Sequence, residues 1–125
     1  MDAFLELFSF EGRANRAWFF WHSVLDDFVV LTSIIALVVL GITTGPILAL
    51  PMVGVLVAAA WAATAIAVKR LHDLGRPGWH ILGTMVPIYN IYLGLVMLFK
   101  KGQIGPNEYG PDPLEAPQHR GSLYP

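Results

Sequence analysis

The sequence predicts an all-α integral membrane protein with three transmembrane helices and a short N-terminal interfacial helix. Hydrophobic residues make up 55% of the 125-residue chain and charged residues only 14%, against about 25% charged in soluble domains. No Asp, Glu, Lys or Arg occurs in residues 28–68 or in residues 77–99. The charged segment between these two apolar stretches predicts a loop that joins membrane segments. We expect one membrane domain over residues 1–113 and a flexible polar tail over residues 114–125.

Composition and motifs argue against several classes of function. Eight basic and nine acidic residues give a net charge of -1, which does not indicate a nucleic-acid surface. The absence of cysteine excludes disulfides, thiolate metal sites and thiol nucleophiles. No nucleophile elbow or phosphate-binding loop occurs, so we expect no enzyme and no cofactor. His72, Asp73 and His80 are separated by a helix end and a Pro-Gly turn, so we predict no metal site.

The N-terminal residues 2–10 predict a short amphipathic helix on the membrane surface. Phe4, Leu5, Leu7 and Phe8 fall within two helical turns and leave the acidic residues for the wetter side. The alternative is an irregular terminus whose aromatic rings reach the headgroups. The start lacks the basic region of a signal peptide, so we expect the first span to be an uncleaved anchor.

The first span is predicted over residues 21–43, after an aromatic block typical of an interfacial belt. At 1.5 Å per residue this helix would cross the roughly 30 Å hydrocarbon layer. Asp26 and Asp27 lie in its first two turns, where the helix dipole and headgroup water favour a carboxylate. Their alternative role is to line an ion pathway. Residues 43–46 predict the turn to the next helix.

The second helix is predicted over residues 51–74, with Pro51 as one of its early residues. Small side chains on one of its faces would let another span or a second copy of the chain approach closely. That face carries Gly54, Ala58, Ala62 and Ala65.

The end of the second helix is well specified. Gly75 suits the left-handed cap position, and Pro77 prevents continuation of the helix. Arg70 and Asp73 are three residues apart, so their side chains are expected to pair.

The third apolar segment, residues 79–99, is predicted as a full crossing that is kinked at Pro87. Proline at this position cannot donate to the carbonyl of Gly83. The Asn90 amide needs a partner in hydrocarbon, either a freed carbonyl or a facing helix. A re-entrant hairpin that turns at residues 87–90 is the alternative.

The distribution of basic residues predicts the membrane topology. Cations precede the first span and follow the second, whereas the turn at 43–46 is uncharged, so the N-terminus is expected in the cytoplasm. A full third crossing would place Lys100 and Lys101 outside, a mild violation that favours the re-entrant alternative. The predicted cytoplasmic cations are Arg13, Arg16, Lys69, Arg70 and Arg76.

Three polar blocks resemble a known family. The blocks are Phe10-Glu-Gly-Arg-Ala-Asn-Arg16 with Trp18 or Trp21 behind it, Arg70-Leu-His-Asp-Leu-Gly-Arg-Pro-Gly-Trp79, and Gly102-Gln-Ile-Gly-Pro-Asn107-Glu-Tyr-Gly-Pro-Asp-Pro113. Together they resemble the bacterial inner-membrane family catalogued as domain of unknown function 805. His80 departs from the second aromatic residue that often follows the central tryptophan. The resemblance implies a small inner-membrane protein and transfers no catalytic or binding residue.

Two function classes remain, and both are non-enzymatic. The first is an accessory protein whose cytoplasmic cations bind anionic lipid or a partner protein. An equally simple interpretation is that these cations only set the topology. The binding candidates are Arg13, Asn15, Arg16, Arg70, His72, Asp73, Arg76, Trp79 and Asn107. The alternative class is an oligomeric transporter or channel component that uses Asp26, Asp27 and Asn90 at membrane depth.

Overall fold

The computed structural model describes residues 3–115, and all the secondary-structure elements in this part of the chain are helices. This confirms the all-α part of the predicted fold class, with two helices, and not three, long and apolar enough to cross a membrane. One isolated antiparallel bridge joins Asn107 to Gly110. The elements are α1 (Ala3–Glu6), α2 (Arg16–Thr44), α3 (Pro46–Asp73), the 3-10 helix η1 (Gly78–Met85) and α4 (Pro87–Phe99).

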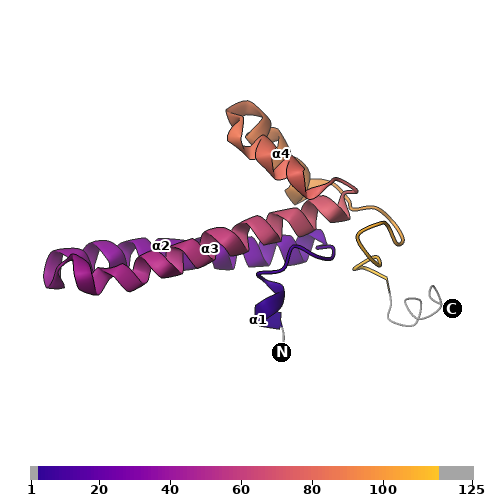
Figure 1. The fold of residues 1–125 in the computed structure, drawn as a ribbon. Helices are drawn as coiled ribbons and strands as arrows, with labels where there is room; N and C mark the ends of the chain where they lie inside the picture. Colours follow the sequence, from indigo (N-terminus) through magenta and orange to yellow (C-terminus); the bar gives the residue numbers. More distant parts are fainter. Residues whose placement is uncertain (1–2, 116–125) are drawn as a thin grey trace.

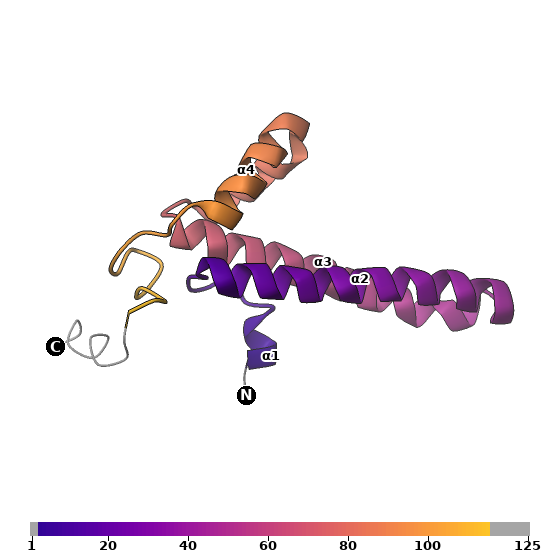
Figure 2. The same cartoon turned by 180° about the vertical axis from the view of Figure 1, so that it is seen from behind.

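The long helices α2 and α3 lie side by side as an antiparallel pair (Figures 1 and 2). Only Gly45 separates them, and its φ of 93° is a conformation that glycine adopts readily. Both helices are long and apolar enough to cross a membrane, and most of their apolar side chains are exposed. An apolar surface of this extent is typical of contact with lipid.

Helix α3 begins five residues earlier than the sequence indicated. Pro46 occupies the first turn, where its fixed φ favours a helix and its missing N–H costs nothing. Pro51 therefore lies inside the helix and does not start it. The predicted small-residue face is only partly buried. Ala62 and Ala65, its two residues nearer the C-terminal end of α3, are buried within the chain. Gly54 and Ala58 remain exposed.

The segment predicted as one kinked helix over residues 79–99 is two helices instead. The 3-10 helix η1 ends before Val86, whose extended φ of -94° and ψ of 114° breaks the path, and Pro87 then starts α4. Pro87 is thus an N-terminal helix residue and not an interior kink. Helix α4 has 13 residues, or about 20 Å at 1.5 Å per residue, which is shorter than a bilayer core.

Helices η1 and α4 fold back on each other, and both ends of this hairpin lie at the C-terminal end of α3. The two helices approach closely at Gly83, because a Cβ at this position would collide with the ring of Tyr89. At the other end, Arg70 Nε donates to the carbonyl of Met97 at 2.6 Å. The path therefore has the hairpin shape of the alternative prediction, with its turn at Val86.

A hydrophobic cluster joins α2, α3 and α4 close to this end of the molecule. Leu93 and Met97, four residues apart on α4, present one apolar face to it. The cluster consists of Phe19, Ile66, Leu71, Leu74, Leu93 and Met97.

The N-terminal helix is shorter than predicted, since α1 covers only Ala3–Glu6. In both views α1 and α4 lie on opposite sides of the α2 and α3 pair (Figures 1 and 2). The chain after α1 is tied to α3, because Trp61 Nε1 donates to the carbonyl of Phe8 at 3.0 Å. The predicted flexible tail lies outside the described residues from residue 116 onward.

Candidate functional site

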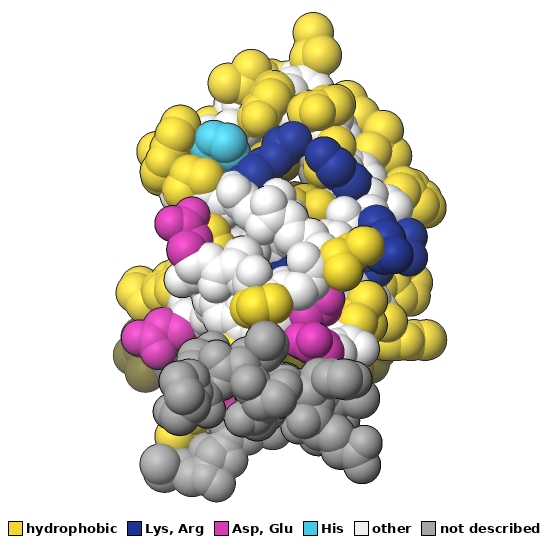
Figure 3. Space-filling model, turned by 90° about the vertical axis from the view of Figure 1, so that its right-hand side faces the viewer, with side chains coloured by type: hydrophobic (Ala, Val, Ile, Leu, Met, Phe, Trp, Pro, Cys, Tyr) yellow, Lys and Arg dark blue, Asp and Glu magenta, His cyan; other side chains and the backbone are white. Residues whose placement is uncertain are grey.

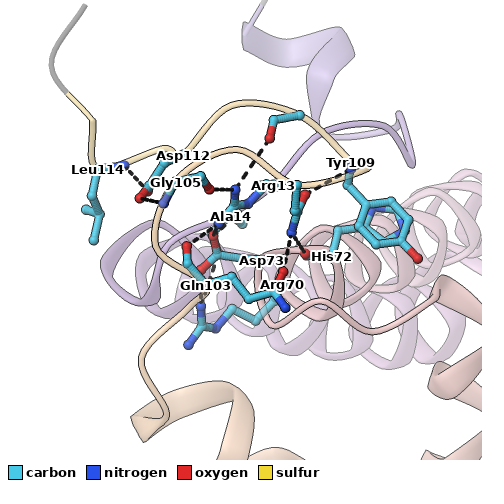
Figure 4. Close-up of polar contacts among 12 residues, drawn as sticks. Arg13, Ala14, Arg70, His72, Asp73, Gln103, Gly105, Tyr109, Asp112 and Leu114 are labelled. Atoms are coloured by element: carbon cyan, nitrogen blue, oxygen red, sulfur yellow. Dashed lines mark hydrogen bonds and ion pairs between the residues drawn. The ribbon is translucent and has the colours of Figure 1, made fainter. Parts of the chain in front are cut away.

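The three polar blocks meet at one end of the molecule, although they are far apart in the sequence (Figure 4). We call this end the polar cap and define it as residues 9–16, 69–77 and 100–113. Backbone bonds tie the blocks together: Ala14 N–H donates to Lys69 O at 3.1 Å, and Gln103 N–H donates to Asp73 O at 2.8 Å. The cap is therefore a folded unit and not three separate loops.

The end of α3 has the predicted cap. Gly75 has a φ of 73°, and its N–H donates to His72 O at 3.0 Å. Arg76 N–H reaches back to Leu71 O at 2.8 Å. This pair of bonds is a Schellman motif, which satisfies the last helical carbonyls and turns the chain toward η1.

Arg70 lies at the centre of the cap, and its side chain is 0% exposed. Its Nη1 lies 2.6 Å from Asp73 Oδ2, which confirms the predicted pair. Its side chain also donates to three backbone carbonyls, namely those of Ala14 in the first block, Met97 in α4 and Lys100 at the start of the third block. A guanidinium has five donors in a fixed plane, so one arginine can join three segments in this way.

Arg13 repeats this arrangement from the other side of Asp73. Its Nε donates to Asp73 Oδ1 at 3.1 Å, and its side chain is 1% exposed. Nη1 donates to the carbonyl of Gly105 at 2.6 Å, and Nη2 donates to the carbonyl of Gln103. The third block therefore wraps around an arginine of the first.

Asp73 is the shared anion of this cluster, with one carboxylate oxygen for each arginine. The backbone at Gly102 passes so close that a Cβ there would collide with the Asp73 carboxylate. Two buried cations therefore face one buried anion, and the excess donors are satisfied by carbonyl oxygens. Buried ions must be paired and hydrogen-bonded in this manner to offset their desolvation.

His72 and Asn107 fasten the edge of the cap. His72 Nδ1 donates to the carbonyl of Gly12 at 3.1 Å, since a carbonyl can only accept. Asn107 Nδ2 donates to the carbonyl of His72 at 2.9 Å. The ring of Tyr109 stacks on the His72 imidazole, with centroids 3.9 Å apart and planes 1° from parallel. His72 and Asn107, both predicted binding residues, thus hold the third block in place.

Asp112 closes the third block on itself. Its carboxylate accepts from the N–H of Gly105 and from the N–H of Leu114, both at 2.9 Å. Slight burial raises the pKa of Asp112, but these two donors and the positive charge of Arg13 lower it by more. The pKa of this carboxyl therefore lies below its ordinary value. Slight desolvation and the neighbouring Glu108 raise the pKa of the Tyr109 phenol.

The other predicted binding residues lie closer to the surface. Asn15 caps α2, because its side-chain oxygen accepts from Trp18 N–H at 2.9 Å. Arg16 is exposed and donates to Phe99 O at 3.1 Å, while Arg76 is half-buried and Trp79 is exposed. Figure 3 views this end and shows Lys and Arg side chains on its upper half, Asp and Glu mainly to the left and below, and hydrophobic side chains around the edge.

The intramembrane candidates do not line one cavity. Asp26 faces an apolar cavity between α1, α2 and α3. Asp27 faces a different cavity between α2 and α4. Asn90 is exposed on α4 and lines neither of these cavities. Within the described residues, the three groups therefore form no continuous polar path.

Sequence reasoning missed the acceptors of the cluster. The carbonyls of Gln103 and Gly105 carry much of the contact with Arg13, and backbone carbonyls leave no trace in a sequence. Gly102 did offer a signal, because glycine is the residue that permits a close approach of backbone to a charged group. Lys69 was counted among the cytoplasmic cations, but its burial at 6% exposure was not expected.

Comparisons with known proteins agree with the three-block pattern. Inner membrane protein YhaH of Escherichia coli (strain K12) is 30% identical over 125 residues, which cover 94% of this chain and 100% of the relative. Inner membrane protein YhaI of the same strain is 31% identical over 106 residues, which cover 83% of this chain and 85% of the relative. No solved structure matches the chain. The model of the family described as protein of unknown function (DUF805) matches residues 7–111, which include the first two blocks and the third block as far as Pro111, and the chain belongs to that family.

Proposed function

We propose that this chain is a non-enzymatic accessory protein of the bacterial inner membrane that docks on anionic lipid headgroups through its polar cap. The observation that carries the proposal is the separation of the cap into two kinds of cation. Arg13 and Arg70 are buried and engaged, whereas another set of cations stays at the surface. We call this set the cationic rim, and it comprises Arg16, Arg76, Lys100 and Lys101.

The proposed topology has two crossings, α2 and α3, with the hairpin of η1 and α4 re-entering the same leaflet. The relatives named as inner membrane proteins support the placement of this chain in that membrane. The rim cations all lie at one end of the helix pair, and the connection around Gly45 at the other end is uncharged, which favours a cytoplasmic cap and N-terminus. A short hairpin at membrane depth is tolerated where it packs against protein.

The buried cluster acts as the scaffold of this docking surface. The buried side chains of Arg70 and Arg13 spend their donors on Asp73 and on backbone carbonyls, so their role in this proposal is to fix the backbone. Because Arg70 and Arg16 hold the carbonyls of Lys100 and Phe99, the start of the third block is fixed beside α2. Exposed Trp79 and Trp21 add the aromatic side chains that favour the interface.

The test is lipid enrichment around the purified protein. We would reconstitute the chain in vesicles of equal phosphatidylglycerol and phosphatidylcholine, extract it gently and quantify the retained lipids. The parent is expected to retain an excess of phosphatidylglycerol that falls at high salt. The double variant Lys100→Gln with Lys101→Gln should lose much of that excess, since each base contributes about 1 kcal/mol near an anionic surface.

Two matched variants complete this experiment. Lys100→Arg with Lys101→Arg keeps the charge and should keep the enrichment, whereas Glu108→Gln removes an exposed charge of the opposite sign and should not reduce it. Equal retention of both lipids by the parent, or unchanged enrichment in the double glutamine variant, would overturn the proposal.

A further inference from the structure

Lys69 is the one buried cation of the cap that has no carboxylate partner among residues 3–115. It is 6% exposed, and its Nζ donates to a single described acceptor, the carbonyl of Glu6. The ammonium group also lies 5.4 Å from the centre of the Trp18 ring. An ammonium has three donors, so this buried charge is incompletely satisfied.

Lys69 faces a polar cavity of about 540 Å³ between α1, the first block and the third block. Arg13 also lines this cavity, but its charge is already paired with Asp73. The carboxylates of Glu6 and Glu11 belong to the same lining and would repel an anion from that part of it. The free hydrogen-bonding capacity therefore lies at Lys69.

An apolar cavity of about 330 Å³ lies on the next helical turns of the same elements. On α3, Ile66 lines it and is three residues from Lys69; on α2, His22 lines it and is four residues from Trp18. Residues at these spacings share a helix face. Apart from His22 and Asp26, the residues that line it are apolar, and they include Leu7 of the segment after α1.

We propose that these two cavities form one site for a membrane phospholipid, with the phosphate at Lys69 and an acyl chain in the apolar cavity. The order of the groups fits the membrane, because the polar cavity lies at the cap and the apolar cavity lies deeper along α2 and α3. The Glu6 carboxylate attracts Lys69 but forms no ion pair with it, and an anion at Lys69 would supply that ion pair for the buried ammonium. The site uses none of the rim residues, and it rests on the proposed function only for placing Lys69 at headgroup depth.

The experiment measures the thermal unfolding midpoint of the full chain in dodecyl maltoside as dodecyl phosphate is added. This probe carries one phosphate and one chain. Sodium phosphate tests the anion without the chain, and dodecyl trimethylammonium tests the chain with the opposite charge. Dodecyl phosphate is expected to raise the midpoint in a saturable manner, because a ligand that binds only the folded state stabilises it. The other two compounds should not.

Two variants address the two halves of the site. Lys69→Met removes the charge and should weaken the apparent affinity about tenfold, as loss of a charge-assisted hydrogen bond does. Ala58→Leu fills the apolar cavity and should weaken it comparably. Ala63→Leu, at an exposed position of α3 outside both cavities, is the matched control for Ala58→Leu and should respond as the parent does.

The midpoint without ligand separates binding from a structural role. If Lys69 only holds α1 through the Glu6 carbonyl, Lys69→Met lowers this midpoint and leaves the response to dodecyl phosphate unchanged. A binding role leaves the midpoint equal or higher, since an apolar side chain replaces a buried charge that has no ion-pair partner, and weakens the response to dodecyl phosphate about tenfold. Any of three results would overturn the inference. They are an equal response to sodium phosphate, an unchanged response in Lys69→Met and Ala58→Leu, and no response in the parent.

The rim variant separates this inference from the proposed function. Lys100→Gln with Lys101→Gln should still respond fully to dodecyl phosphate. Normal response combined with a parent that shows no phosphatidylglycerol enrichment would reject the proposed function and leave the lipid site standing.

Discussion

Arg13 Nε lies 3.1 Å from Asp73 Oδ1, and sixty positions of sequence separate the two residues. The other carboxylate oxygen lies 2.6 Å from Arg70 Nη1. One aspartate at the end of α3 therefore links the segment before α2 to its own helix, and through Arg13 to the carbonyls of Gln103 and Gly105. The predictions below concern how this linkage supports the cap.

Replacing Asp73 by Ala should destabilise the protein strongly. Both arginines would remain buried without a counter-ion, a change that typically costs 3–5 kcal/mol. The free energy of unfolding in detergent micelles measures this cost. Glu108→Ala, at an exposed position of the third block, should change it by no more than about 0.5 kcal/mol. An equally small effect of Asp73→Ala would show that the cluster does not hold the cap.

Replacing Gly102 by Ala should displace the third block from α3. The new Cβ would meet the Asp73 carboxylate, which cannot move away without losing both arginines. Gly94→Ala is the matched control, because its Cβ would meet nothing within 4 Å and alanine favours a helix. Hydrogen exchange of the Gln103 amide, which donates to Asp73 O, reports the displacement. Slow exchange of this amide in Gly102→Ala would contradict the proposed close approach.

The third block should loosen in acid as Asp112 is protonated. The pKa of Asp112 is lowered in the folded protein, so its contribution to stability is present above the ordinary value of 3.8 and is lost as the pH falls through the lower, folded value. The amide resonances of Gly105 and Leu114, its two donors, should shift together with a midpoint below 3.8. A common midpoint at or above 3.8 would contradict this prediction, and Asp112→Asn should abolish the transition.

Local patterns made the end of α3 predictable. Gly75 as a left-handed cap, Pro77 as a helix stop and the pair of Arg70 with Asp73 all depend on residues within one or two turns. Such features follow from spacing alone, because a helix fixes which residues are neighbours. The burial of this pair was not predictable, since it depends on segments that arrive from elsewhere in the chain.

The path of residues 79–99 is a feature that the spacing of residues in the sequence does not determine. Pro87 is equally compatible with a kink inside a helix and with the first turn of a new one. What selects the second is tertiary: Arg70 binds the carbonyls of Met97 and Lys100, and this brings the end of α4 back to α3. The charges of Lys100 and Lys101 were the only trace of this in the sequence.

The hairpin predicts that the third block lies on the same side of the membrane as the first. Since the chain has no cysteine, single cysteines can be introduced at exposed positions and labelled in intact vesicles with an impermeant maleimide. Glu11→Cys and Ile104→Cys should label together, whereas Thr44→Cys, at the far end of α2, should label only from the opposite side. The physical reason is that Arg13 binds the carbonyls around residue 104, which a full third crossing would place a bilayer away. Labelling of Ile104→Cys together with Thr44→Cys would reject the hairpin and with it the joined cap, because the buried arginines would then have no carbonyls to bind.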